Sequence, residues 1–100
     1  MIHALLDTTK VIGTLDREGG SFEVCAEATA NHAHGDNLLT VNLRSYLRST
    51  QHVHLGETVV PDWLPTPQVV TEHVAIDEAH EMTNEIFASW CRKVAESIPH

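Results

Sequence analysis

Hydrophobic residues near the end of the chain recur every three or four positions, which is the spacing of one face of a helix. The series predicts a helix over about residues 78–97. Its apolar positions are Ala79, Met82, Ile86, Trp90, Val94 and Ile98, with Phe87 and Cys91 beside them. Asp77 is the expected N-cap, and Arg92 and Lys93 suit the negative end of the helix dipole. Pro99 prevents much continuation of the helix.

Earlier in the chain the pattern changes to an alternation of apolar and polar residues, which indicates strands with one wet face. The alternation is clearest from Phe22 to Ala30. We expect strands over residues 11–15, 22–30, 39–48, 51–60 and 68–76. The glycines at positions 19 and 20 suit a hairpin between the first two strands. Three prolines exclude regular hydrogen-bonded structure over residues 61–67.

The order of these elements predicts an α+β fold, in which an antiparallel sheet of about five strands is followed by one long C-terminal helix packed on one face. One hundred residues suit a single domain over residues 1–100. A single sheet has a second face and two edges to protect, whereas one helix covers only one face. We therefore expect a homodimer.

Charge and composition narrow the classes of partner. Fourteen acidic residues against six basic ones give a formal net charge of −8. This balance argues against binding to nucleic acid, which depends on Lys and Arg, and favours a basic protein partner. No apolar run approaches the ~20 residues that cross a membrane, and no signal peptide is visible. The sequence indicates a cytoplasmic protein in which Cys25 and Cys91 are reduced thiols.

Eight histidines in 100 residues are the compositional feature that suggests chemistry. The spacing of His32, His34 and Asp36 resembles the HxHxD motif of metallo-β-lactamase-type hydrolases. The resemblance covers five residues, and Asn37 stands where that motif has another histidine. We therefore consider only a local site for a divalent metal such as zinc, because imidazole and carboxylate groups suit this ion. The alternative is a polar loop tip.

A second candidate metal site lies in the strand expected over residues 51–60. His52 and His54 are two positions apart, so both imidazoles share one face of the strand. With Glu57 they form an HxHxxE pattern, which is similar to the first cupin metal motif except that the cupin acid lies one residue further along. The alternative is an ordinary strand surface that faces solvent.

The remaining motifs are incomplete. His80 and Glu81 match the start of the HExxH motif of zinc peptidases, but Asn84 replaces the second histidine and removes that mechanism. Neither a phosphate-binding glycine loop nor a GxSxG elbow occurs. We therefore assign no catalytic residue and no cofactor-binding residue.

Three functions stay open on this basis. The first is a small non-enzymatic binding or assembly module that acts as a homodimer with an acidic surface. The second is a metal-binding domain or metal-dependent enzyme that uses strand and loop histidines. The third is a small-molecule pocket between sheet and helix. Trp63, in the proline-rich segment, and Tyr46 are the aromatic candidates for such a pocket or for an interface.

Overall fold

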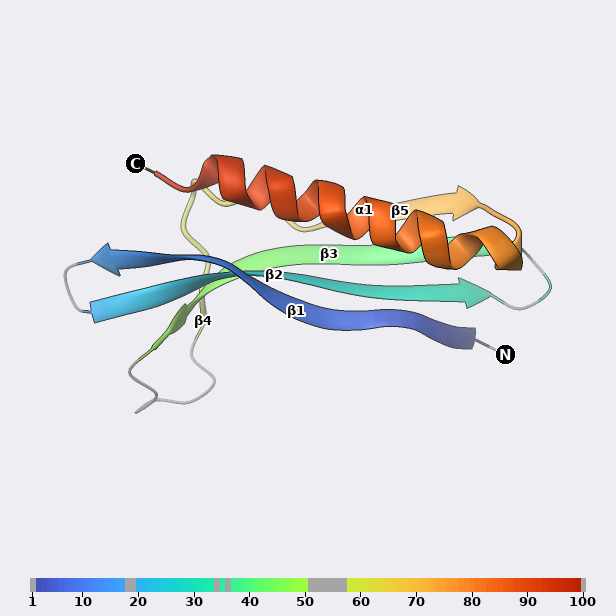
Figure 1. The fold of residues 1–100 in the computed structure, drawn as a ribbon, viewed down its shortest axis with the longest axis horizontal. Coiled ribbons are helices and arrows are strands. Elements are labelled where there is room, and N and C mark those ends of the chain that lie inside the picture. Colours follow the sequence, from blue (N-terminus) through green and yellow to red (C-terminus); the bar gives the residue numbers. More distant parts are fainter. Residues whose placement is uncertain (1, 18–19, 34, 36, 51–57, 100) are drawn as a thin grey trace.

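The computed structural model describes residues 2–17, 20–33, 35, 37–50 and 58–99. The described strands precede a single long helix (Figure 1). The elements are β1 (Ile2–Arg17), β2 (Gly20–Ala33), β3 (Leu38–Ser49), β4 (Thr58–Val59), β5 (Gln68–His73) and α1 (Ile76–Ser97). The α+β fold, an antiparallel sheet followed by one long C-terminal helix, is confirmed.

The described sheet is four strands wide, and all its pairings are antiparallel. β2 lies between β1 and β3, while β5 and β4 pair with successive parts of the far edge of β3. The predicted count of about five strands is therefore slightly off, because two short segments share one edge. Of the strand expected over residues 51–60, only Thr58–Val59 forms a described strand, and residues 51–57 lie outside the described part.

β1 is much longer than the strand predicted over residues 11–15. Its pairing with β2 shifts register twice, around Leu5 and around Ile12. An extra residue at each of these β-bulges interrupts the alternation of side chains between the two faces. Leu5 and Leu6 consequently both pack against the core although they are adjacent. The two bulges explain why alternation revealed only part of this strand.

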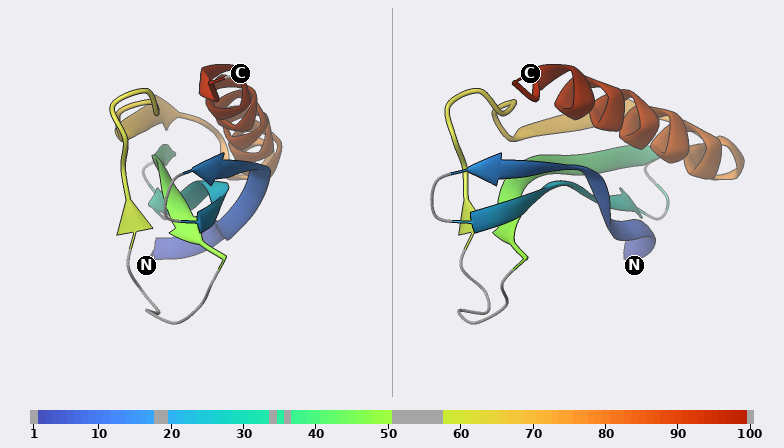
Figure 2. Two further views of the ribbon diagram at one scale, coloured as in Figure 1. Left: turned by 90° about the vertical axis from the view of Figure 1, so that its left-hand side faces the viewer. Right: turned by 60° about the vertical axis from the view of Figure 1, so that its left-hand side comes forward.

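α1 lies along one face of the sheet and contacts β1, β2 and β3 (Figures 1 and 2). It begins at Ile76, and its N-cap is Ala75 without a side-chain hydrogen bond, so the predicted N-cap Asp77 is wrong. Asp77 lies in the first turn instead, where a negative charge still suits the dipole. The helix ends at Ser97, as predicted, but Arg92 and Lys93 precede its last turn, which has no basic residue. The described residues contain no helix that is both long and apolar enough to cross a membrane.

The core lies between α1 and the sheet face beneath it. The buried hydrophobic strand residues on this face are Val24, Ala26, Ala28, Ala30, Leu39, Val41, Leu43 and Leu47. The small alanines of β2, in the middle of the sheet, leave room for the larger side chains of the helix. Ala79, Trp90 and Val94 are buried there, which confirms the predicted helix face. Met82 and Ile86 are half-buried and pack at its border.

The opposite face of the sheet carries ion pairs on its central strands, on either side of the buried pair Cys25 and Tyr46. Arg48 pairs with Glu23 at 3.0 Å, and Arg44 pairs with Glu27. The Arg44 guanidinium carbon also lies 4.9 Å from the ring centroid of Tyr46. An antiparallel sheet with one polar face can remain in water without a second layer. The homodimer was expected from the second face and the two edges of the sheet, and it stays a prediction.

Residues 61–67 form turns without a strand or a helix, as the three prolines predict. Leu64 is buried in the core, and Trp63 is half-buried against it. The hydroxyl of Ser45 donates a hydrogen bond to the carbonyl of Pro65 at 3.3 Å. The segment therefore packs against the sheet and covers part of the core.

Candidate binding cleft

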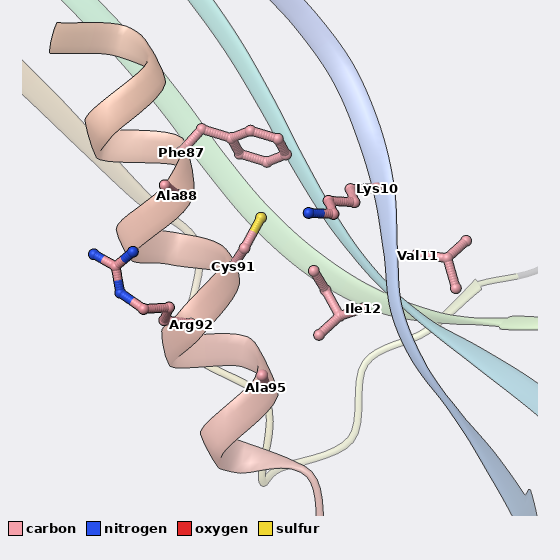
Figure 3. Close-up of a pocket in the computed structure, with 8 residues that line it drawn as sticks. All are labelled: Lys10, Val11, Ile12, Phe87, Ala88, Cys91, Arg92 and Ala95. Atoms are coloured by element: carbon pink, nitrogen blue, oxygen red, sulfur yellow. The ribbon is translucent and has the colours of Figure 1, made fainter. Parts of the chain in front are cut away.

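A cleft of about 430 Å³ lies between the edge strand β1 and the helix α1. It is lined by Lys10, Val11, Ile12, Phe87, Ala88, Cys91, Arg92 and Ala95 (Figure 3). Sites for small ligands commonly have volumes of roughly 300–1,000 Å³ and mostly apolar walls. The cleft has this size and this composition, with two basic residues added to the apolar walls.

The bulge around Ile12 decides which side chains of β1 reach the cleft. Lys10 pairs with Ala26 on the face that carries α1, and Ile12 is the extra residue at the bulge. Figure 3 shows Lys10 and Ile12 pointing toward α1 and Val11 pointing away from it. A bulge re-aims side chains in this manner, and it is a common feature beside functional sites.

On the helix, Phe87 and Cys91 are one turn apart and both point toward β1 (Figure 3). Ala88 is too small to fill the space beside them. Further along, a Cβ atom on Gly13 would lie only 3.2 Å from Cδ1 of Ile98. The glycine thus lets the residue that follows α1 approach β1 closely.

The cleft is locally positive although the chain is acidic. Two of the six basic residues, Lys10 and Arg92, line it, whereas Arg44 and Arg48 form ion pairs on the opposite face. Figure 3 shows the Lys10 ammonium group extending toward α1 and the Arg92 guanidinium group pointing away from β1. Lys10 has no ion-pair partner among the described residues. It is therefore the cation that a ligand in the cleft can reach.

The thiol of Cys91 adds no negative charge. Burial raises its pKa, and the nearby charges of Lys10 and Arg92 lower that pKa by a smaller amount. The neutral thiol therefore predominates at neutral pH, and it is a weak nucleophile. Cys25 is fully buried, and burial raises the pKa of its thiol as well. Both cysteines are free thiols in the structure.

One of the predicted metal ligands, His32, lies among the described residues. It is buried, and its Nε2–H donates a hydrogen bond to the carbonyl of Val74 at 2.8 Å. Its Nδ1 atom is buried without a hydrogen-bond partner among the described residues. The part of the chain that the structure describes contains no group of three potential metal ligands. Outside that part lie His34, Asp36, His52 and His54.

The two aromatic candidates do not line the cleft. Tyr46 lies on the opposite face of the sheet beside Arg44, and Trp63 packs against the core. Neither residue lies in the space between β1 and α1.

Lys10 and Ile12 were not among the predicted site residues, and Phe87 and Cys91 were predicted only as parts of the helix face. The signal that could have revealed them is the apolar pair formed by Val11 and Ile12 within an otherwise alternating strand. Such a pair is what a bulge produces when it turns an extra apolar residue inward.

Comparisons of this chain with protein-family models, with curated proteins and with solved structures found no match. The fold and the cleft define an α+β chain with a partly positive, mostly apolar cleft at one edge of its sheet.

Proposed function

We propose that this chain is a small non-enzymatic binding module whose ligand occupies the cleft between β1 and α1. The observation that supports the proposal is the ammonium group of Lys10, which reaches over apolar walls and has no ion-pair partner among the described residues. The ligand then has two parts. A negative charge pairs with Lys10, and an apolar portion lies against Ile12 and Phe87.

The two parts of the ligand contribute in different ways. A charge-assisted hydrogen bond to the ammonium group fixes the orientation of the ligand. Contact with the apolar walls supplies affinity, at about 25 cal/mol for each Å² removed from water. The thiol of Cys91 does not oppose an anion, because burial raises its pKa and keeps it neutral.

Cys91 provides a direct readout of occupancy. It is half-buried in the cleft wall, whereas Cys25 is fully buried, so a maleimide should react with Cys91 first. Dodecanoate, below its micelle-forming concentration, should slow this reaction in proportion to its binding. Dodecyltrimethylammonium has the same chain with the opposite charge and should bind at least about tenfold more weakly, a difference of about 1.4 kcal/mol. Equal protection by both probes, or protection by neither, would contradict the proposal.

Two variants separate the role of Lys10 from that of net charge. Lys10→Gln should weaken dodecanoate binding about tenfold, because it removes a charge-assisted hydrogen bond. Arg17→Gln removes the same charge from the same strand, but Arg17 does not line the cleft, so this variant should bind as the parent does. An equal loss in both variants would show that only the overall charge of the chain matters. Circular dichroism checks that both variants are folded.

The homodimer, the basic protein partner and the cytoplasmic location stay separate proposals. An acidic ridge supports the basic partner, because Asp77, Glu81 and Glu85 are all exposed along α1.

Light scattering at micromolar concentration should report twice the chain mass of 11.1 kDa if the homodimer forms. The mass of a single chain at high concentration would show that the polar sheet face needs no cover.

A further inference from the structure

We infer that the cleft between β1 and α1 accepts an extended acidic–apolar segment of a partner protein, which adds a strand to the free edge of β1. This inference rests on the proposed function and names the class of ligand for the same site. It follows from the pairing of β1, from the alternation of side chains along a strand, and from the position of Lys10.

β1 is an edge strand, since among the described strands it pairs only with β2. Its outer side presents backbone N–H and C=O groups to any further strand, and such an edge is a template for strand addition. Bulges disturb that template around Leu5 and Ile12. The regular stretch between them is Leu6–Val11, six residues that include Lys10. The cleft lies beside the end of this stretch, so an added strand would run along it.

Side chains of the added strand point alternately toward α1 and away from it. A residue directly opposite Lys10 faces the same side of the sheet and lies within reach of its ammonium group. Residues two positions away on the added strand also face α1, where the walls of the cleft are Ile12 and Phe87. The segment that fits therefore has an acidic residue with apolar residues two positions before and after it.

A second copy of the chain fits this edge less well. When two β1 strands pair antiparallel about a two-fold axis, residues that lie directly opposite each other share one face of the sheet. The acidic residues of β1 are Asp7 and Asp16, which pair with Thr29 and Ser21 on the face away from α1. Lys10 lies on the face toward α1, so no two-fold register places either acid opposite it. Charge complementarity thus favours a different partner, one with an acid on the helix side.

Three capped heptapeptides test the inference on the full chain. TVTETVT carries the acid and two apolar residues on one face of a strand. TVETTVT moves the acid to the other face, and TVPEPVT keeps the spacing but removes two backbone N–H donors. Isothermal titration should give at least about tenfold tighter binding of TVTETVT than of either control. With TVTETVT bound, hydrogen exchange of the outward-facing amides in Leu6–Val11 should slow at least about tenfold.

The outcomes distinguish this inference from the proposed function. If TVPEPVT binds as tightly as TVTETVT, or if hydrogen exchange in β1 is unchanged, strand addition is overturned. If dodecanoate still protects Cys91 in that case, the proposed function stands without the peptide. If neither probe binds, both are wrong. If exchange in β1 slows with protein concentration alone while the mass doubles, a second copy occupies the edge, and the peptide partner is overturned.

Discussion

Trp90→Phe should destabilise the protein more than any comparable aromatic substitution, because Trp90 joins the helix to the sheet in two ways. Its ring is buried in the core, with 2% of its surface exposed. Its indole N–H donates a hydrogen bond to the backbone carbonyl of Arg44 at 3.0 Å. On β3 the pairing with β5 ends at Leu43, and the pairing with β4 begins at Leu47, so Arg44 lies between the two paired stretches. The indole therefore binds β3 at a position where neither short strand pairs with it.

The expected loss can be worked from these two contacts. Removing the donor leaves the carbonyl of Arg44 without this partly buried hydrogen bond, which costs about 1–2 kcal/mol. Replacing the indole by a phenyl ring also removes buried apolar surface and leaves a small cavity, which costs about 1–2 kcal/mol. The free energy of unfolding should fall by about 2–4 kcal/mol, a large share of the roughly 5–15 kcal/mol that is typical of small domains.

Urea unfolding followed by far-UV circular dichroism measures this loss. The midpoint should fall while the slope m stays nearly constant, because a smaller ring at one position changes the total surface exposed on unfolding very little. Trp63→Phe is the matched control, since Trp63 is half-buried and makes no hydrogen bond to a described residue. It should cost about 1 kcal/mol or less. If the two variants lose the same free energy, the indole does not anchor α1 to β3 and the reasoning is refuted.

Burial and charge give three further predictions. Ile86→Asp should lower the free energy of unfolding, because it places a charge at the half-buried border of the core. Exposed Glu85→Ala should be nearly neutral in urea unfolding, and equal tolerance would contradict the assigned helix face. Burial raises the pKa of Cys91 and of Cys25, so both should react with iodoacetamide more slowly than a free thiol at neutral pH. The reaction should accelerate as the pH rises through the raised pKa, and Cys25 should be the slower of the two. A fast reaction at neutral pH, measured by mass spectrometry, would contradict this prediction. The formal net charge of −8 at pH 7 falls toward zero as the pH is lowered to the sequence pI of about 5.3, so solubility should fall over that interval, and constant light scattering would rule this out.

The helix and the central strands could be predicted because their patterns are local. Apolar residues from Ala79 to Val94 recur at the helical period, and every step of that series follows from α-helix geometry alone. Phe22 to Ala30 alternate without interruption, and β2 pairs on both sides without a bulge of its own. Asp77 was the wrong N-cap because it has the preferred side chain but lies two residues inside the helix.

β1 was only partly predictable, since its pattern depends on its partner. Leu5 and Ile12 are extra residues only in relation to the register with β2, so neither the helical period nor the strand alternation reveals them. The histidines were singled out by number and spacing, yet the structure turns His32 inward to the carbonyl of Val74. Spacing states which side chains share a face, but it does not state whether that face is covered.

By itself the sequence determined an acidic α+β chain, a long amphipathic C-terminal helix and antiparallel strands before it. The tertiary structure alone decided that the helix approaches the edge strand β1 with a cleft between them. Lys10 and Cys91 line this cleft together although they are far apart along the chain. The physical reason is that hydrophobic periodicity shows which face of an element is apolar, whereas the neighbour against which that face packs is set by the topology, the strand register and the bulges of the whole sheet.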